Sequence, residues 1–335
     1  MSLFIPRENY RPTMSVRETQ SAIKFIRDFI HESFETSFNL ERVSASMIVC
    51  PASGMNDNLS GSERPVRFDA PGIGKDVEIV HSLAKWKRMA LKQYGFKPGE
   101  GLYTEMNAIR RDEVLDNTHS IYVDQWDWER IITYEERTID TLVRVATQLF
   151  DMLKELETNV AARFTNIKRY LPGSLTVLSA QELMDAYPGL GEKEREDAVC
   201  REHRAVFLTQ IGDVHNNGER HGSRAPDYDD WTMNGDLLFY YPLLDSAFEI
   251  SSMGVRVDAE TLVAQVEKTN NRERLTLPYH RAVLEGQLPY TIGGGLGQSR
   301  ICMFMLDKLH VGEVHASVWP EEMIEACSQA GISLL

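Results

Sequence analysis

The sequence predicts an α+β fold in which helices pack on a mostly antiparallel sheet. Long stretches place apolar residues at three- and four-residue steps, which is typical of amphipathic helices. Strand-like segments flank a polar loop in the manner of an antiparallel hairpin. No repeat, linker or low-complexity segment interrupts the 335 residues. One compact domain spanning residues 1–335 is therefore expected.

The composition is that of a globular protein with an acidic balance. Hydrophobic residues make up 42% of the chain and charged residues 26%, and the net charge is −14. This charge argues against loose binding to nucleic acid or to an anionic membrane, so no partner of either kind is expected. Neither a signal peptide nor an apolar run of membrane-spanning length is recognisable. We expect a soluble cytoplasmic protein, in which an anionic ligand needs a local basic cluster.

The first third of the chain predicts a helix, a strand, a second helix and a hairpin. The predicted ranges are 23–34 for the helix, 43–49 for a strand ending at Pro51, 82–95 for a helix with Ser82 as N-cap, and 102–109 and 120–128 for the hairpin strands. These elements alternate in the order expected of a mixed fold.

The rest of the chain predicts a long helix followed by further strands. The predicted elements are an amphipathic helix over 139–164, a capping box at Ser179 and Glu182, a strand over 206–211, a polar loop over 216–223, strands over 237–244 and 247–257, and a helix over 301–306. Pro242 places part of its strand at an edge or a bulge.

Residues 293–300, GGGLGQSR, form a predicted glycine-rich turn that leads through Arg300 into a helix. Glycines let a backbone approach an anion, helical N–H groups point at it, and an arginine adds fixed charge. The pattern suits a nucleotide phosphate, and a tight turn before a buried helix is the alternative. No GK[ST] ends the segment, and Gln298 stands where a dinucleotide fingerprint needs glycine.

The second hairpin strand carries polar residues on both faces. The two-residue period places Gln125 and Asp127 on one face, roughly 7 Å apart. Tyr122, Asp124, Trp126 and Trp128 point the other way. A solvent-facing strand is the alternative, and an exposed salt bridge is the plain explanation of Arg110 at the end of the other strand.

Carboxylates are dense between residues 224 and 236. Asp229 lies in RAPDYDDW, and Asp236 follows at a predicted turn. Such density resists burial unless cations or a metal neutralise it, and a solvated acidic loop is the alternative. In the next strand, alternation places Ser252 and Arg256 opposite Glu249, so joint action of the three needs a bulge near Gly254.

Other chemistry-bearing residues are ambiguous when taken singly. Asp57 and Lys87 read individually as ordinary surface charges. His215 and His221 flank a polar loop, but no cysteine pairing or HExxH pattern supports a zinc site. The four cysteines, at positions 50, 200, 302 and 327, form no CxxC pair and are expected to be reduced.

Several of these segments together resemble the ammonia-dependent asparagine synthetases (aspartate–ammonia ligases), relatives of the class II aminoacyl-tRNA synthetases. The matching strings are DNLSG at 57–61, HSLAKWKR at 81–88, GEGLYT at 99–104, HSIYVDQWDWER at 119–130, RAPDYDDW at 224–231, NGD at 234–236, FEISSMGVRVDA at 248–259 and TIGGGLGQSR at 291–300. The resemblance covers nearly the full length and implies a class II synthetase-like catalytic domain.

Two class II motifs are identified through this resemblance. Arg110 with Glu113 resembles motif 2, and the segment ending at Arg300 resembles motif 3. Ser46 stands where the family commonly has proline in motif 1, which loosens the inference of a homodimer and leaves the chemistry intact.

The resemblance implies a reaction in two steps with ATP as substrate and Mg²⁺ as cofactor. The side-chain carboxylate of L-aspartate attacks the α-phosphate and gives β-aspartyl-AMP and pyrophosphate, and ammonia then displaces AMP to leave asparagine. Arg110 on the α-phosphate and Arg300 on the outer phosphates stabilise the developing charge. Ser120 and Gly295 belong to the same ATP and AMP site.

The remaining roles also follow from the resemblance. Asp236 and Glu249, with Ser252 nearby, are assigned to magnesium and the nucleotide. Lys87 and Arg256 hold the α-carboxylate of aspartate, Asp127 and Asp229 hold its ammonium, and Gln125 orients the reacting group between substrate and nucleotide. Asp57 binds ammonium and accepts its proton.

Two other functions remain open from the sequence. One is an aminoacyl-tRNA synthetase for aspartate, asparagine or lysine, although no second region for reading an anticodon is apparent. The other is a catalytically silent regulator that binds an amino acid or AMP, which the retention of both arginines disfavours. Glutamine as nitrogen donor is not expected, because no cysteine stands in a recognisable glutaminase context.

Overall fold

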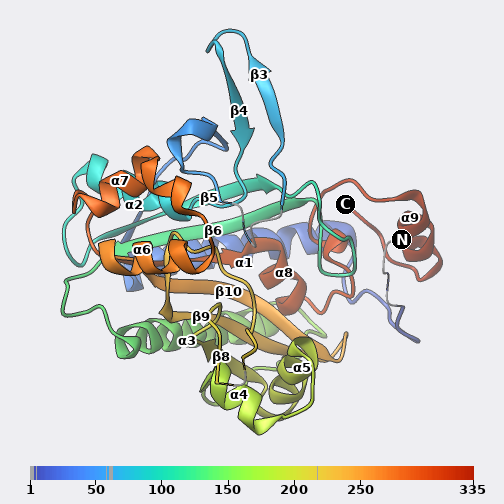
Figure 1. The fold of residues 1–335 in the computed structure, drawn as a ribbon. Coiled ribbons are helices and arrows are strands. Elements are labelled where there is room, and N and C mark those ends of the chain that lie inside the picture. Colours follow the sequence, from blue (N-terminus) through green and yellow to red (C-terminus); the bar gives the residue numbers. More distant parts are fainter. Residues whose placement is uncertain (1–3, 5, 58, 60–62, 217) are drawn as a thin grey trace.

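A sheet of eight strands organises the computed structural model, which describes residues 4, 6–57, 59, 63–216 and 218–335 (Figure 1). Across the sheet the order is β1-β5-β6-β11-β10-β9-β8-β7. The β1/β5 and β7/β8 pairs are parallel, and the other neighbouring pairs are antiparallel. The mostly antiparallel sheet with flanking helices confirms the predicted fold class.

The strands of this sheet come from the whole length of the chain. They are β1 Leu40–Arg42, β5 Gly101–Ile109, β6 Tyr122–Ile131, β7 Thr176–Ser179, β8 Ala205–Thr209, β9 Asp229–Tyr241, β10 Ser246–Arg256 and β11 Thr291–Gly297. The hairpin predicted at 102–109 and 120–128 is β5 and β6, paired from Gly101 opposite Arg130 to Ile109 opposite Tyr122. Pro242 lies just beyond the end of β9, so its placement at an edge or bulge within a strand was wrong.

The strand predicted over 43–49 was also wrong. β1 ends at Arg42, and β2, Ile48–Val49, belongs to a separate three-stranded sheet with β4, Lys75–Ile79, and β3, Arg67–Ala70. The β3/β4 hairpin projects from the body of the molecule (Figure 1). The apolar run at 43–49 therefore crosses from one sheet to another, a change of direction that its composition does not reveal.

The helices differ in how they begin: some have a side-chain N-cap, at Ser15, Thr138, Ser179 and Asp258, and the other described helices have none. They are α1 Val16–Ser37, α2 Ala84–Tyr94, α3 Ile139–Arg163, α4 Ala180–Ala186, α5 Glu192–His203, α6 Ala259–Lys268, α7 Pro278–Leu284, α8 Gln298–Met305 and α9 Glu321–Gln329, with 3₁₀ turns at Pro51–Ser53, Arg272–Thr276 and Val311–Glu313. The Ser179–Glu182 capping box of α4 is confirmed. Ser82 is not the N-cap of α2, because Leu83 holds that position and the Ser82 hydroxyl accepts from the Ala84 amide at 3.1 Å.

One face of the sheet carries the main core. Helix α1 buries Ile23, Ile26, Ile30 and Phe34, and α3 buries a stripe from Leu142 to Val160 against the same cluster. Trp126 and Trp128 of β6 point into it, together with alternate residues of β9 and β10. Both tryptophans are almost fully buried, so this face of β6 is not solvent-exposed.

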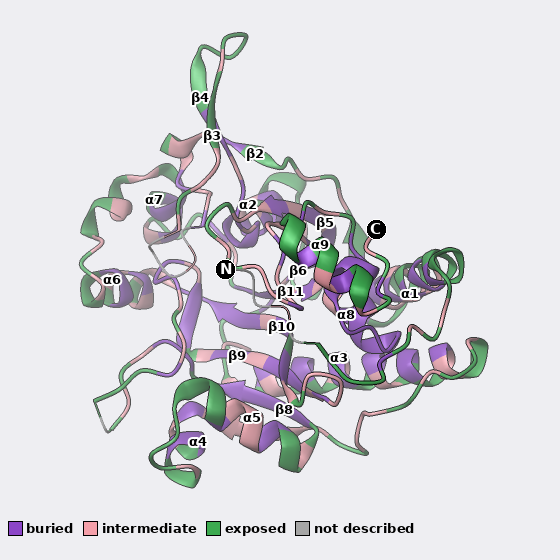
Figure 2. Ribbon diagram, turned by 90° about the vertical axis from the view of Figure 1, so that its right-hand side faces the viewer, coloured by how far each residue is buried: buried purple, intermediate pink, exposed green. Residues whose placement is uncertain are grey.

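The opposite face is covered at its two ends by smaller apolar clusters, and β8, β9 and β10 are largely buried, drawn purple in Figure 2. Helix α2 packs near β5 and β6, α4 packs on β7, and α5 packs on β8, β9 and β10. Between α2 at one end and α4 with α5 at the other, the polar residues of β6, β10 and β11 face none of these helices. This central stretch of sheet forms the floor of the cleft described below.

The glycine segment is a strand and not the predicted turn. Gly293, Gly294, Gly295 and Gly297 lie in β11, which pairs with β6 on one side and β10 on the other. None of the four has a positive φ. A Cβ at Gly295 would stand 2.6 Å from Gln125 Oε1 and 2.8 Å from Asp127 Oδ1. Close approach of neighbouring side chains, and not a turn, requires these glycines.

The two ends of the chain pack together (Figure 1). The Tyr10 hydroxyl donates to the Glu313 carboxylate at 2.9 Å, and Glu313 Oε1 accepts the Leu309 amide at 2.9 Å. Among the described residues, no helix is both long and apolar enough to cross a membrane.

Candidate active site

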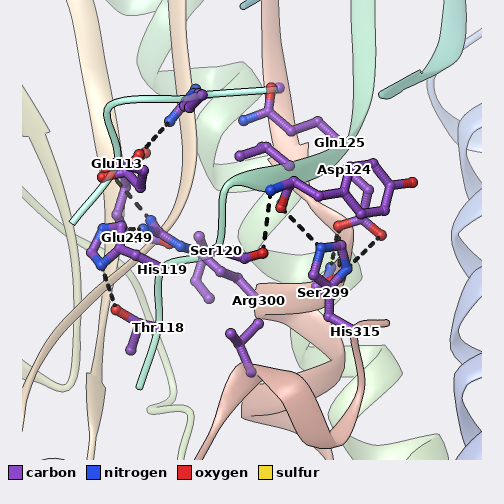
Figure 3. A pocket seen from close by; sticks show the side chains of 17 residues that line it. Glu113, Thr118, His119, Ser120, Asp124, Gln125, Glu249, Ser299, Arg300 and His315 are labelled. Atoms are coloured by element: carbon purple, nitrogen blue, oxygen red, sulfur yellow. Dashed lines mark hydrogen bonds and ion pairs between the residues drawn. The ribbon is translucent and has the colours of Figure 1, made fainter. Parts of the chain in front are cut away.

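Two pockets open side by side on the uncovered face of the sheet. The first, here called the His119 pocket, has a volume of about 220 Å³ and is bounded by the hairpin loop after β5, by β6 and by α8 (Figure 3). The second, the Lys87 pocket, has a volume of about 340 Å³ and lies between α2, β6, β9 and β10. Five residues line both pockets: Arg110, Glu113, Gln125, Glu249 and Gly295. The two pockets therefore form one continuous cleft.

The two arginines of the motifs meet in this cleft, as predicted. Arg110 lies at the junction of the pockets, with Nη1 4.0 Å from a Glu113 oxygen, and its buried Nε has no hydrogen-bond partner. Arg300 projects from α8 into the His119 pocket (Figure 3). Its Nη1 donates to the Glu249 carbonyl at 3.1 Å, and its Nη2 donates to His119 Nε2 at 2.9 Å. Residues 190 positions apart thus present guanidinium groups to a common space.

The floor of the Lys87 pocket is the polar face of β6. Gln125 and Asp127 line it together, which confirms that they share a face. Lys87 is buried, and its Nζ lies 3.2 Å from Asp127 and 2.9 Å from the Gly294 carbonyl. Burial lowers the pKa of Lys87, while the neighbouring carboxylates oppose that shift. Its reading as an ordinary surface charge was wrong.

Arg256 holds two carboxylates at the inner end of this pocket. Its Nε and Nη2 donate to Glu129 at 3.0 and 2.7 Å, and its Nη1 donates to Asp229. All three residues are almost fully buried. Burial raises the pKa of Asp229, whereas Arg256 holds that of Glu129 below its usual value despite burial. The carboxylate density around residue 229 is therefore neutralised inside the protein and is not a solvated loop.

Glu129 is the main residue of the site that the sequence interpretation did not select. Its carboxylate also lies 3.9 Å from Lys87 Nζ. The signal was present, because the two-residue period that aligned Gln125 and Asp127 continues to Glu129. Strand β6 thus supplies three alternate inward residues, the last of which orients Lys87 and Arg256.

A bulge in β10 solves the alternation problem. The pairing with β9 shifts between Glu249 and Ser251 and again between Gly254 and Arg256. Glu249, Ser252 and Arg256 consequently all line the Lys87 pocket. At the first shift Ile250 is the extra residue of β10, which brings Glu249 onto the face of Ser252 and Arg256; at the second, near Gly254 as expected, the extra residues lie in β9.

Asp236 lies within β9 and not at the predicted turn. It pairs with Arg224, which is itself part of the Lys87 pocket lining and was not selected from the sequence. Burial raises the pKa of Asp236 to about 6, and the nearby charge of Glu249 adds to this effect. Burial also acts on Glu249, but the guanidinium groups of Arg300, Arg224 and Arg110 hold its pKa below the usual value.

Asp57 closes the other side of the Lys87 pocket. Its Oδ1 accepts the Leu59 amide at 2.9 Å, and its buried Oδ2 has no partner. Burial raises the pKa of this carboxyl, and the positive charge of Lys85 works against the shift. Asp57 is therefore a buried carboxyl with an unused oxygen, which its reading as a surface charge did not anticipate. Residues 58 and 60–61 of the DNLSG string lie outside the described part of the chain.

The far wall of the His119 pocket comes from the C-terminal segment. Ser120 lines the pocket, and its hydroxyl lies 2.6 Å from that of Ser317. His315 stacks on Tyr122 with ring centroids 4.6 Å apart and lies 2.6 Å from the Ser299 hydroxyl (Figure 3). No sequence pattern linked residues 315–317 to the hairpin, so this wall was not predicted.

A separate polar cluster lies at α5. Oxygens of Glu192 and Glu196 and a ring nitrogen of His221 are within 4.8 Å of one another. The sequence interpretation set aside a metal at His221 without foreseeing these carboxylates on an adjacent helix. All four thiols, of Cys50, Cys200, Cys302 and Cys327, are free.

Solved structures with a similar fold are class II synthetases. An asparaginyl-tRNA synthetase from Pyrococcus horikoshii in complex with asparaginyl-adenylate matches 91% of this chain and 70% of its own, with a TM-score of 0.66 and 13% identity. The Entamoeba histolytica asparaginyl-tRNA synthetase, also with asparaginyl-adenylate, matches 90% and 66%, with a TM-score of 0.64 and 11% identity. These likenesses establish the class II synthetase fold.

Sequence relatives match from end to end. Proteins named aspartate–ammonia ligase from Ruminiclostridium cellulolyticum and Lactobacillus johnsonii are each 54% identical over 100% of both chains. One from Clostridium perfringens is 55% identical over 99% of both. The family model described as aspartate–ammonia ligase matches residues 17–331. The chain therefore belongs to the aspartate–ammonia ligase family.

Proposed function

We propose that the continuous cleft is where this ligase makes L-asparagine from L-aspartate, ammonia and ATP, through β-aspartyl-AMP and with release of AMP and pyrophosphate. One observation carries the proposal. Arg110, Gln125 and Gly295 line both pockets, so a ligand in one can react with a ligand in the other at this junction. An adenylate needs such an arrangement, because the amino acid and the α-phosphate become one molecule.

The His119 pocket is assigned to ATP. Arg110, at the junction, stabilises charge on the α-phosphate, and Arg300 does so on the outer phosphates. The orphaned, buried Nε of Arg110 supports a ligand oxygen as its missing acceptor. Ser120 contacts the nucleotide from the hairpin side, and Gly295 leaves room for it at the floor.

The Lys87 pocket is assigned to aspartate. Lys87 and Arg256 hold the α-carboxylate, because the contacts described above leave N–H donors over on both groups. Asp127 and Asp229 hold the ammonium group, and the orphaned Oδ1 of Asp127 supports this role. With both α-substituents fixed, Gln125 orients the β-carboxylate toward the α-phosphate. Selectivity follows because each charge of aspartate meets its opposite in a fixed position.

Asp57 is assigned to ammonia. Ammonium has no lone pair, so it must lose a proton before it can attack the acyl carbon. A buried carboxyl with an unused oxygen can bind ammonium and accept that proton, and a raised pKa brings its basicity nearer to the task. Attack forms the amide bond and breaks the bond between the acyl carbon and the phosphate oxygen, which leaves with AMP.

The residues present fit a magnesium ion. Asp236 and Glu249 are neighbouring carboxylates, and burial together with the negative charge of Glu249 keeps the pKa of Asp236 raised although Arg224 opposes the shift. Oxygen ligands of this kind are the ones that magnesium prefers. Asp236 and Glu249 would hold the ion with Ser252 nearby, and magnesium would there neutralise phosphate charge.

We further propose that residues 1–335 act as one catalytic domain in a cytoplasmic homodimer. The cleft draws residues from Asp57 to His315, which supports a single unit. Exposed apolar side chains at Met47, Ile48, Phe68 and Ile73 gather on the small sheet and support contact with a second copy. A monomeric mass by light scattering would contradict the dimer.

A product assay tests the proposed function. The protein is incubated with ATP, magnesium, L-aspartate and ammonium, and nucleotides and amino acids are separated. We expect AMP and asparagine in equal amounts. ADP in place of AMP, or consumption of ATP without asparagine, would contradict the reaction. Aminoacylation of tRNA with aspartate or asparagine under the same conditions would favour a synthetase activity instead.

A further inference from the structure

We propose that Asp116 and His119 are positioning residues, which hold the Arg300 guanidinium in its phosphate-binding orientation through a chain of hydrogen bonds. The proposal rests on the assignment of Arg300 to ATP and extends it to two residues of the loop between β5 and β6. Neither residue was selected from the sequence, and Asp116 does not line the His119 pocket.

Each hydrogen bond between Arg300, His119 and Asp116 has a defined donor and acceptor. Arg300 Nη2 lies 2.9 Å from His119 Nε2, and a guanidinium can only donate (Figure 3). His119 Nε2 must therefore accept with its lone pair. The proton of the neutral ring then resides on Nδ1, which lies 2.9 Å from both oxygens of Asp116. A single tautomer of His119 satisfies both contacts, with Nδ1–H donating to the carboxylate.

Asp116 is itself fixed and ionised. Its Oδ1 accepts the amides of Thr118 and His119 at 2.6 and 2.8 Å, so the carboxylate closes a tight turn before the ring that it orients. Burial opposes its ionisation, but the hydrogen bonds from His119 and Thr118 hold the pKa of Asp116 below its usual value. The Asp116 carboxylate is thus available as an acceptor for His119 at any pH at which the protein functions.

Arg300 is held from its other side as well. Its Nη1 donates to the Glu249 carbonyl at 3.1 Å, and its guanidinium lies 5.6 Å from the centroid of the Phe248 ring. The two hydrogen bonds engage two of its five N–H donors. The remaining donors are available to phosphate oxygens, and the group has little freedom left to lose when ATP binds.

Loss of the Asp116 carboxylate would leave the tautomer of His119 unspecified. Without the carboxylate, the proton of His119 can reside on Nε2, and that N–H then faces the N–H of Arg300. Two donors repel each other, so Arg300 would turn away from the phosphate position. The backbone amides need only a neutral acceptor, and asparagine supplies one. Asp116→Asn therefore weakens the tautomer control and keeps the turn.

The first experiment measures aspartate-dependent exchange of pyrophosphate into ATP. For Asp116→Asn we expect the KM for ATP to rise about tenfold while the KM for aspartate stays within about twofold, since a charge-assisted hydrogen bond is lost on the nucleotide side only. His119→Gln should retain most of the activity because its amide oxygen can accept from Arg300. His119→Leu, which cannot accept, should behave like Asp116→Asn or worse.

A variant outside both pockets controls for the loss of a carboxylate that accepts a backbone amide. Asp213 accepts the Val214 amide at 2.8 Å and pairs with Lys268, and it lines neither pocket. Asp213→Asn should leave both KM values unchanged. If Asp116→Asn matched this control, or if His119→Leu equalled His119→Gln, the positioning role would be refuted.

The tautomer can be read without turnover. In protein labelled with ¹⁵N-histidine, the nitrogen shifts should show His119 protonated on Nδ1 and not on Nε2, with the signal assigned by its loss in His119→Gln. Asp116→Asn should move population to the Nε2–H form. A wild-type ring protonated on Nε2 would overturn the proposal even in an active enzyme. Absence of exchange in the wild type would instead refute the assignment of the site to ATP.

Discussion

At the scale of single residues, the cleft is defined by buried charges that lack a complete set of partners. Arg110 Nε, Asp127 Oδ1 and Asp57 Oδ2 are buried without a hydrogen bond in the described part of the chain. An unpaired buried polar atom costs roughly 1–3 kcal/mol. Arg224 Nε is a fourth such atom, and together they indicate positions where substrate atoms complete the hydrogen bonding.

The separate role proposed for Asp57 predicts a split between the half-reactions. In Asp57→Asn the amide oxygen can still accept the Leu59 amide, so the local turn should persist. Pyrophosphate exchange should stay within about threefold of wild type, while asparagine formation should fall about 100-fold, the usual contribution of a general base. Equal loss in both assays would contradict the base role.

Most residues that line the site could be selected from the sequence, but their burial and their partners could not. The selected residues Asp57, Lys87, Gln125, Asp229 and Arg256 do line the Lys87 pocket. Glu129 was missed although it shares their strand face, because nothing local distinguishes a structural carboxylate from a substrate ligand. Ser317 was missed because its contact with Ser120 joins segments 197 positions apart.

At the scale of elements, strand β11 explains why glycines cluster in the segment over 293–297. In the sequence they indicated a turn, whereas in the sheet they leave space for Gln125 and Asp127 from β6 and, at Gly293, for Glu129. Sequence patterns could not separate these cases, since a turn and a close approach both require a missing side chain.

The close approach predicts a selective effect of one methyl group. Gly295→Ala would force its Cβ against Gln125 and Asp127. We expect catalytic efficiency with aspartate to fall about 10- to 100-fold and the free energy of unfolding to fall by about 1–3 kcal/mol. Gly72→Ala, whose added carbon would meet nothing within 4 Å, should change neither value. Steady-state kinetics and denaturant unfolding check both. A Gly295→Ala enzyme with wild-type efficiency would contradict the close-packed floor.

The bulge of β10 at Ile250 is the second feature at this scale. Strict alternation would place Glu249 away from Ser252 and Arg256, yet all three line the Lys87 pocket. The bulge was predicted because Glu249, Ser252 and Arg256 were expected to act together. No pattern in the sequence of β10 itself indicates it. Its exact position depends on pairing with β9, which only the assembled sheet determines.

At the scale of the whole molecule, the C-terminal segment closes the structure over both the nucleotide side of the cleft and the N-terminus. His310 anchors it: the Gly312 amide donates to Nδ1 at 3.0 Å, and Nε2 lies 3.2 Å from the Met323 sulfur. The ring packs against Trp319 with centroids 4.8 Å apart. Because Nδ1 accepts, this buried ring is neutral.

Acid should therefore loosen the segment. Burial lowers the pKa of His310 from 6.5 to about 4, so the folded state binds its proton later than the unfolded state does. The stabilisation is present above pH 6.5 and is lost as the pH falls toward 4, by about 3 kcal/mol in total. His310→Asn, which keeps an acceptor for Gly312, should lose this part of the pH dependence. The free energy of unfolding of both proteins is measured with urea from pH 7 to 4.5. An equal loss in the two proteins over this range would contradict the role of His310.

The fold as a whole was more predictable than its connections. Amphipathic periods located α1 and α3, and alternation located β5, β6 and β10, because those signals are local. The break between β1 and β2 and the start of β9 at Asp229 were missed, since both depend on partners distant in sequence. The family resemblance predicted how these elements come together, which local sequence patterns do not show.

The central claim is that aspartate is activated at its β-carboxylate by the α-phosphate of ATP. The most direct measurement uses L-aspartate labelled with ¹⁸O in the β-carboxyl group and determines the mass of the nucleotide product. The account predicts AMP that carries one ¹⁸O atom, together with asparagine that keeps the other, because the bond that breaks lies between carbon and oxygen. Unlabelled AMP, or label found in free phosphate beside ADP, would contradict it.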